Sequence, residues 1–180
     1  MGNTPVGVIV SPAVEPIKVL AMAIQNQMGI PDGQIMLGLE NWSIPSTDTG
    51  LYIALFYGPD QYVGNNNTNG VDANGNYEEI QSAILLHDIT IDIMSFDSSA
   101  RVQKEEVMQA LQSSYALSLM EKYQMRFART PASVTPVPNL EPSKMLNRFQ
   151  ISVLLNAIHT KVLTAAYFDS LQTVQLTVQP

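Results

Sequence analysis

One stretch in the middle of the chain constrains the fold more than any other. Over residues 88–93, apolar and polar side chains alternate, with Ile89, Ile91 and Ile93 set against Asp88, Thr90 and Asp92. Alternation with a period of two is typical of a strand that has one buried face and one face in solvent. The sequence therefore predicts a sheet that is covered on one side here.

A helix is predicted directly after this strand, over about residues 101–123. Asp97, Ser98 or Ser99 can cap it, because a short side-chain oxygen accepts a hydrogen bond from a free N–H of the first turn. Apolar residues then recur at steps of three and four, which makes a single apolar stripe: Val107, Met108, Leu111, Tyr115 and Leu119. A half-buried strand followed by an amphipathic helix gives two surfaces that cover each other.

The rest of the chain supplies one more helix and several strands. The helix begins at Pro12 or Pro16 and ends at Gly29, since proline tolerates the first turn and glycine a left-handed end. Strands are predicted at 34–42, 51–57, 149–157 and 173–178, with a loop or one helical turn at 159–166. Where the sheet meets the central helix, these residues are expected to be buried: Ile91, Ile93, Leu111, Ile151 and Val153.

Taken together, the elements predict a single α+β domain over residues 1–180, with a mixed or antiparallel sheet flanked by helices. Three segments lie outside the regular elements. Residues 1–11 form an extended N-terminal arm, residues 59–77 an Asn/Gly-rich loop or hairpin, and residues 129–147 a proline-rich crossover.

Composition excludes several classes of function. The net charge is −7 and no stretch carries a cluster of Lys and Arg, which argues against a surface that neutralises nucleic-acid phosphates. No cysteine is present, so disulfides, thiolate metal sites and cysteine nucleophiles are ruled out. Only 14% of residues are charged, against about 25% in typical domains, which favours a surface covered by partners.

No residue pattern indicates catalysis, a cofactor or a metal site. Asp88 and Asp92 lie about 13 Å apart along one strand face, too far to share one ion. The two histidines, His87 and His159, belong to no cluster of ligands. The chain is therefore expected not to be an enzyme and to need no cofactor.

The order of features resembles that of the neck or tail terminator proteins of tailed bacteriophages. The first helix leads to a strand ending in Glu40-Asn41-Trp42, then to a proline loop and the strand at residues 51–55. The alternating strand at 88–97 runs into the central helix. The segment at 148–155 is followed by Tyr167-Phe168-Asp169-Ser170-Leu171 and an alternating last strand. The resemblance covers about residues 17–178.

This resemblance implies a structural virion protein that is assembled in the host cytoplasm and located in the neck of the tail. Such subunits form a ring, commonly hexameric, which ends tail-tube polymerisation and joins the tail to the head connector. The expected partners are other copies of the chain, the tail tube protein and the head–tail connector proteins. No membrane is involved, and genomic DNA passes through the lumen of the ring without specific binding.

Two sets of residues are candidates for these contacts. Three carboxylates on or just beyond the alternating strand, Asp88, Asp92 and Asp97, are candidates to line the lumen, with plain solvation on the outer wall as the alternative. The arm and the two irregular segments are expected to reach neighbouring subunits through Val8, Ile9, Asn66, Asn69 and Val137.

Two other classes of protein stay open at this point. One is another neck, connector or tube ring component of a phage or phage-like particle. The other is a module that binds small ligands or carbohydrates on an aromatic platform of Trp42, Tyr52, Tyr57, Tyr62 and Tyr77.

Overall fold

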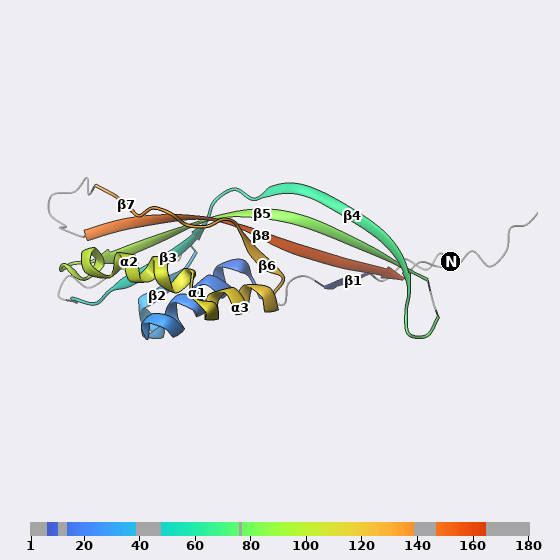
Figure 1. Ribbon diagram of the computed structural model, residues 1–180, viewed down its shortest axis with the longest axis horizontal. Helices are drawn as coiled ribbons and strands as arrows, with labels where there is room; N and C mark the ends of the chain where they lie inside the picture. Colours follow the sequence, from blue (N-terminus) through green and yellow to red (C-terminus); the bar gives the residue numbers. More distant parts are fainter. Residues whose placement is uncertain (1–6, 11–13, 39–47, 76, 139–146, 165–180) are drawn as a thin grey trace, which may run out of the picture.

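The computed structural model describes residues 7–10, 14–38, 48–75, 77–138 and 147–164. It has the expected α+β class, with helices on one face of a mixed sheet (Figure 1). The helices are α1 Pro16–Met28, α2 Ser99–Leu111 and α3 Ser114–Lys122, with a short 3-10 turn, η1 Asp32–Gln34. The strands are β1 Gly7–Val10, β2 Ile35–Leu37, β3 Tyr52–Tyr57, β4 Gln61–Val71, β5 Tyr77–Ser95, β6 Met125–Arg129, β7 Thr135–Pro136 and β8 Asn147–Thr164.

The sheet is organised around one long antiparallel pair, β5 and β8. Their register runs without interruption from Glu78 opposite Thr164 to Ser95 opposite Asn147. Strand β3 pairs with the second half of β5, and β4 pairs with its first half. Strand β2 adds to β3 in parallel, while β1, β6 and β7 pair with successive parts of β8. Every other described strand except β2 therefore pairs directly with β5 or β8, and β2 joins the sheet through β3.

The core lies between the three helices and the half of the sheet that contains β3. The five residues expected to be buried have no exposed surface, which confirms that prediction: Ile91, Ile93, Leu111, Ile151 and Val153. Helix α1 contributes Leu20 and Ile24 to the same cluster. Burying side chains of this size stabilises the fold by about 1.5–3 kcal/mol each.

Helix α1 begins and ends as predicted. Pro16 occupies its first turn, and Gly29 ends it with φ +65°, a left-handed conformation that glycine adopts without a steric penalty. The Gly29 N–H donates to the carbonyl oxygen of Gln25 at 2.9 Å. At the start of α2 the Asp97 carboxylate accepts hydrogen bonds from the N–H and hydroxyl of Ser99, at 2.8 and 2.9 Å.

The single helix predicted over residues 101–123 is wrong, because the structure has two helices there. Ser113 interrupts the helix with an extended backbone, and its hydroxyl oxygen accepts a hydrogen bond from the N–H of Ala116 at 3.1 Å. A serine that caps in this way starts a new helix. The break rotates the apolar stripe, so Tyr115 is exposed while Ala116 and Met120 are buried.

The loop or helical turn predicted at residues 159–166 is also wrong for the described part, because β8 continues to Thr164. The prediction failed because polar residues occupy both faces of the sheet here, so the hydrophobic alternation fades. The Asn/Gly-rich segment forms the hairpin alternative, as β4 and the turn into β5. In that turn Gly75 has φ +84°, and its N–H donates to the Asp72 carbonyl oxygen at 3.0 Å.

Other predicted segments fall partly outside the described residues. Of the strand at 34–42, the described part forms β2, and residues 39–47 lie outside. The crossover at 129–147 contributes the short strand β7, and residues 139–146 lie outside. The strand expected at 173–178 lies outside altogether.

Candidate functional site: an uncovered extension of the sheet

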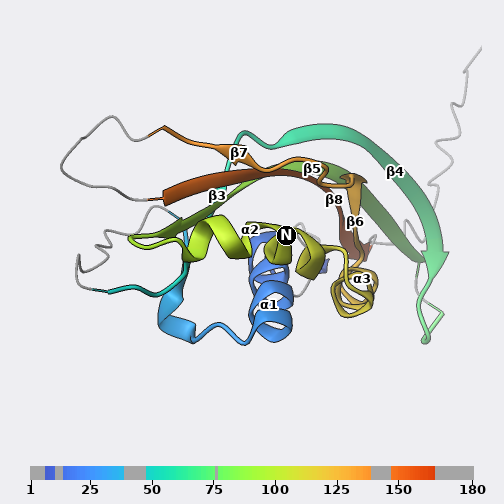
Figure 2. The ribbon, with the colours of Figure 1, turned by 60° about the vertical axis from the view of Figure 1, so that its left-hand side comes forward.

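Half of the sheet projects beyond the helices, and we call it the sheet extension. It consists of β4, residues 77–86 of β5 and residues 156–164 of β8, and its far end bends toward the side of the sheet on which the helices lie (Figures 1 and 2). Residues 78–86 of β5 are all partly exposed, whereas residues 91–95 of the same strand are all buried. The extension therefore contains backbone pairing without a core of its own.

The outer edge of the extension is strand β4. It is eleven residues long, has no charged residue, and within the described part of the chain pairs only with β5. Its side chains are nearly all exposed, including Tyr62 at 62% and Val71 at 68%. Natural sheets usually protect such an edge with charges, prolines, bulges or a covering segment, because its free N–H and C=O groups can pair with another strand. Strand β4 has one register irregularity, between Tyr62 and Gly64, but neither a charge nor a proline.

The opposite edge of the extension carries β1. Val8 and Ile9 lie in β1 opposite Val162 and Lys161 of β8 in the same chain. The described part of the predicted arm is thus a strand of its own sheet, and contact of Val8 or Ile9 with another subunit stays a prediction. Like β4, β1 has no charged residue.

The remaining candidate contact residues lie far apart on the molecule. Asn66 and Asn69 are exposed on β4, at the projecting end. Val137 follows β7 near the other end of the sheet, where its N–H donates to the Arg148 carbonyl oxygen at 2.9 Å. Their roles in contacts between subunits stay predictions, and the two sets would serve different neighbours.

Asp92 does not lie on a solvated face as the sequence pattern indicated, since only 1% of it is exposed. Its carboxylate forms an ion pair with the Arg148 guanidinium and accepts a hydrogen bond from the Gln150 amide at 3.3 Å. A carboxylate that is buried and paired cannot face DNA in a lumen. Asp92 is therefore withdrawn from the candidate lining.

The other two acidic candidates occupy different surroundings. Asp97 caps α2, and the backbone hydrogen bond from Ser99 holds the pKa of its carboxyl below the usual value. Asp88 is partly buried, and its Oδ1 atom has no hydrogen-bond partner within the described part of the chain. The structure thus places the three carboxylates in three separate roles and not in one acidic row.

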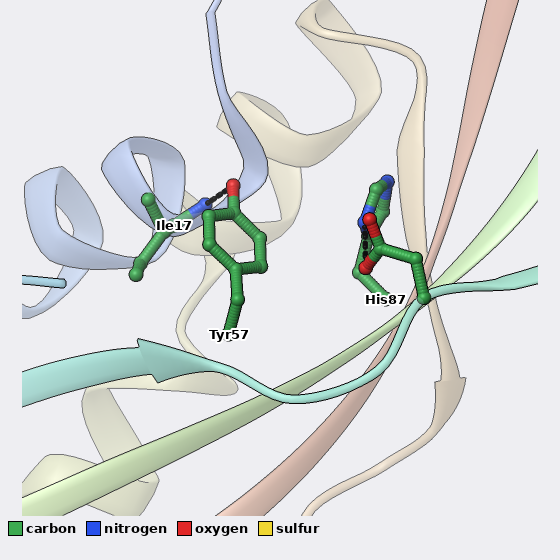
Figure 3. Close-up of polar contacts among 4 residues, drawn as sticks. Ile17, Tyr57 and His87 are labelled. Carbon is green, nitrogen blue, oxygen red and sulfur yellow. Dashed lines mark hydrogen bonds and ion pairs between the residues drawn. The ribbon is translucent and has the colours of Figure 1, made fainter. Parts of the chain in front are cut away.

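At the junction between the covered half and the extension, the fold brings two histidines together. His87 is 5% exposed, and its Nδ1 atom lies 2.8 Å from Oδ1 of Asp60 (Figure 3). Its ring centroid is 5.9 Å from that of His159 and 6.0 Å from that of Tyr57. Tyr57 is itself fixed, because its hydroxyl oxygen accepts a hydrogen bond from the Ile17 N–H at 3.3 Å.

Sequence reasoning missed this cluster for an identifiable reason. His87 and His159 both occupy odd-numbered positions, like Ile89 and Val153, so they share the face of the sheet on which the helices lie. The alternation predicted that face for His87. It did not do so for His159, because the predicted strand stopped at residue 157.

A groove on the same face of the extension adjoins His159. It measures about 320 Å³ and is lined mainly by amide side chains, Tyr62, His159 and Lys161. The aromatic platform expected of a carbohydrate-binding module is not assembled among the described residues. Tyr52 is buried in a cluster on the opposite face from Tyr57, and Trp42 lies outside them.

The described residues contain no group of three or more His, Cys, Asp and Glu side chains arranged to hold a metal ion. No helix in the same part of the chain has the length and hydrophobicity needed to cross a membrane. No protein-family model and no curated protein matches the sequence.

Proposed function

We propose that the chain is the subunit of a homo-oligomeric ring, with six copies as the expected number, at the head-proximal end of a phage tail. The ring would end polymerisation of the tail tube and join the tail to the connector proteins of the head. This places the protein in the virion and assigns it no catalytic role.

The uncharged free edge of β4 is the observation that carries the proposal. An eleven-residue edge without charge or proline is a hazard for a monomer, because it invites pairing with other strands. In a protein that assembles through this edge, the same N–H and C=O groups pair with a strand of the neighbouring subunit and form the interface. The exposed side chains of Tyr62, Val63 and Val71 add apolar area that a neighbour would cover.

The positions of the β4 and β1 edges, neither of which has a further strand partner among the described residues, favour a ring over a two-fold dimer. Strand β4 lies on one side of the extension and β1 on the other, in the order β4, β5, β8, β1. If the β4 edge of one copy pairs with the β1 edge of the next, each copy uses two different surfaces. A head-to-tail contact of this kind closes into a ring when the rotation between neighbours permits it.

Electron microscopy of the purified full-length chain, alone and mixed with tail tubes, tests the proposal. Rings, or caps on one end of the tubes, are the expected result, together with several copies of the chain per virion by quantitative mass spectrometry. A single copy per virion would reject it. Labelled rings along the tube, or on the connector alone, would instead assign the chain to another ring of the same particle.

A further inference from the structure

We propose that His87 and His159 form a binding site for a divalent transition-metal ion of the class that favours imidazole ligands, such as Zn²⁺. The proposal concerns a site that the ring does not require, so it stands or falls independently of the proposed function. It rests on two neighbouring imidazole rings, each of which has a buried Nε2 atom without a hydrogen-bond partner among the described residues.

Asp60 prepares His87 to act as a metal ligand. The Asp60 carboxylate accepts a hydrogen bond from Nδ1–H of His87 at 2.8 Å (Figure 3). A proton held on Nδ1 leaves the lone pair on Nε2, and this arrangement of carboxylate, histidine and metal is the common support of metal-binding histidines. Asp60 is therefore a positioning residue, and Nε2 of His87 is the ligand atom.

Both ligand atoms are available. Nε2 of His87 and Nε2 of His159 are buried and have no hydrogen-bond partner among the described residues. Buried polar atoms are almost always partnered, so two orphans on neighbouring rings call for an explanation. A metal ion between the rings would satisfy both at once.

The distance between the rings fits a shared ion. A Zn–N bond of about 2.0–2.1 Å puts each ring centroid about 3.2 Å from the metal, so two imidazoles on one ion have centroids about 5–6 Å apart. The observed separation is 5.9 Å, with the ring planes inclined at 57°. The two side chains come from β5 and β8, whose continuous pairing fixes their spacing.

The protein supplies two ligands, so the remaining positions of a tetrahedral ion would be filled from outside. The groove lined by Tyr62 and His159 gives water or a small anion access to the His159 side of the site. An open shell of this kind is typical of ions that are exchanged with solvent, in contrast to the closed four-ligand sites of structural zinc.

Titration of the full-length chain with Zn²⁺ alone tests the site, provided that the purification tag contains no histidine. These are the only two histidines, and the chain has no cysteine, so the imidazole ¹⁵N spectrum contains just two side chains. In the metal-free protein His87 should be the Nδ1–H tautomer. Addition of Zn²⁺ should shift Nε2 of both histidines together and saturate at one ion per chain by calorimetry.

Zn²⁺ binding by variants distinguishes the two ligand residues from the positioning residue Asp60 and from an unrelated carboxylate. His159→Gln and His87→Gln should each abolish saturable binding. Asp60→Asn should weaken it about 10- to 100-fold, the usual effect of losing the carboxylate behind a metal-binding histidine. Glu105→Gln is the matched control: it removes the exposed Glu105 carboxylate, which pairs with Lys104 on α2, and should leave binding unchanged.

Three results would overturn the proposal: no shift of either imidazole at saturating Zn²⁺, a shift of only one, or undiminished binding by His159→Gln. Should His87→Gln fail to fold, the spectrum of the natural chain and Asp60→Asn decide the matter. Asp60 is about half exposed, so that variant is expected to fold.

Discussion

The two halves of the β5–β8 pair share one continuous register and differ in almost everything else. In the covered half, odd-numbered residues such as Ile91 and Ile151 are buried under the helices. In the extension, polar side chains are mixed with apolar ones such as Ile80 and Leu85, and residues 78–86 of β5 are all partly exposed. Backbone pairing can thus continue well beyond the part of the sheet that the helices cover.

This contrast indicates that the covered half stabilises the fold and that the extension is available for assembly. A sheet needs an apolar face buried against another layer to be stable on its own. The covered half meets that condition within one chain, and the extension does not. The extension is therefore the region whose stability is expected to change when another molecule binds, and each prediction below compares the two halves.

The largest expected effect is on the core of the covered half. Leu111→Ala should lower the free energy of unfolding by about 2–5 kcal/mol, because a fully buried leucine leaves a cavity. Val63→Ala on β4 is the matched change in the extension and should alter it by less than about 0.5 kcal/mol. Denaturant unfolding of the monomer measures both, and equal effects would show that the extension has a core after all.

A second large effect is expected where the covered half contains a buried charge. Arg148→Met should cost roughly 3 kcal/mol, since Asp92 would remain buried without its cation. We take the lower end of the usual range because Arg148 is itself 42% exposed. The exposed pair of Lys18 and Glu15 supplies the contrast: Lys18→Met should cost less than about 1 kcal/mol.

Denaturant unfolding at pH 7 measures the free energy of unfolding of Arg148→Met, of Lys18→Met and of the natural chain. If Arg148→Met were no less stable than Lys18→Met, the Asp92 carboxylate would have to reach solvent. That result would return Asp92 to the set of candidate lining residues.

The third prediction concerns a double substitution that should block assembly without changing the stability of the monomer. The double variant Asn66→Lys/Asn69→Lys places two charges on the free edge, the usual way in which natural sheets block pairing. The melting temperature of the monomer should stay the same, while ring or cap formation should be lost. Two lysines at exposed positions of the helical layer, Gln109→Lys and Ser118→Lys, are the control and should assemble normally.

Normal assembly of the β4 double variant, measured by electron microscopy, would remove β4 from the interface. Loss of assembly in both variants would point to net charge, and not to the edge, as the cause.

What the sequence predicted follows the same division between the halves. The sequence identified the covered half correctly from the alternation at Ile89–Ile93 and Ile151–Val153 and from the helix end at Gly29. A strand that is buried on one face has apolar residues at every second position, so its sequence shows a clear period of two. The extension is partly exposed on both faces, so apolar and polar residues hardly alternate along its strands. For that reason the end of β8 is predicted as a loop or one helical turn.

The sequence predicted a residue's role in the candidate site only where that role depends on residues nearby in the chain. Asp97 was identified as a possible cap from its position before the helix. The ion pair of Asp92 with Arg148 and the approach of His87 to His159 depend on the register of β5 against β8, which no single segment specifies. Long-range register is therefore what the sequence pattern lacked.

A smaller effect is expected from pH. The pKa of His159 is lowered from its ordinary value of 6.5, mainly by burial. The unfolded chain then binds a proton more readily than the folded chain, so stability is complete above pH 6.5 and falls as the pH drops through the folded pKa. In metal-free solution this loss should be reduced in His159→Gln, as measured by denaturant unfolding between pH 7.5 and 5.

The smallest expected effect is on DNA, where the natural protein should show none. A duplex carries about one negative charge per 1.7 Å, so a channel that lets it slide must not be basic. The extension has a single cation, Lys161, against Glu78 and Glu79 on β5, and the net charge of the chain is −7. Retention of a duplex in 0.15 M salt is therefore expected to be undetectable by anisotropy. Glu78→Lys/Glu79→Lys should produce weak, salt-sensitive binding, because it replaces two carboxylates of the extension with two cations. Submicromolar binding by the natural chain would contradict an acidic channel, because a surface that grips DNA so firmly would hold the genome back during ejection.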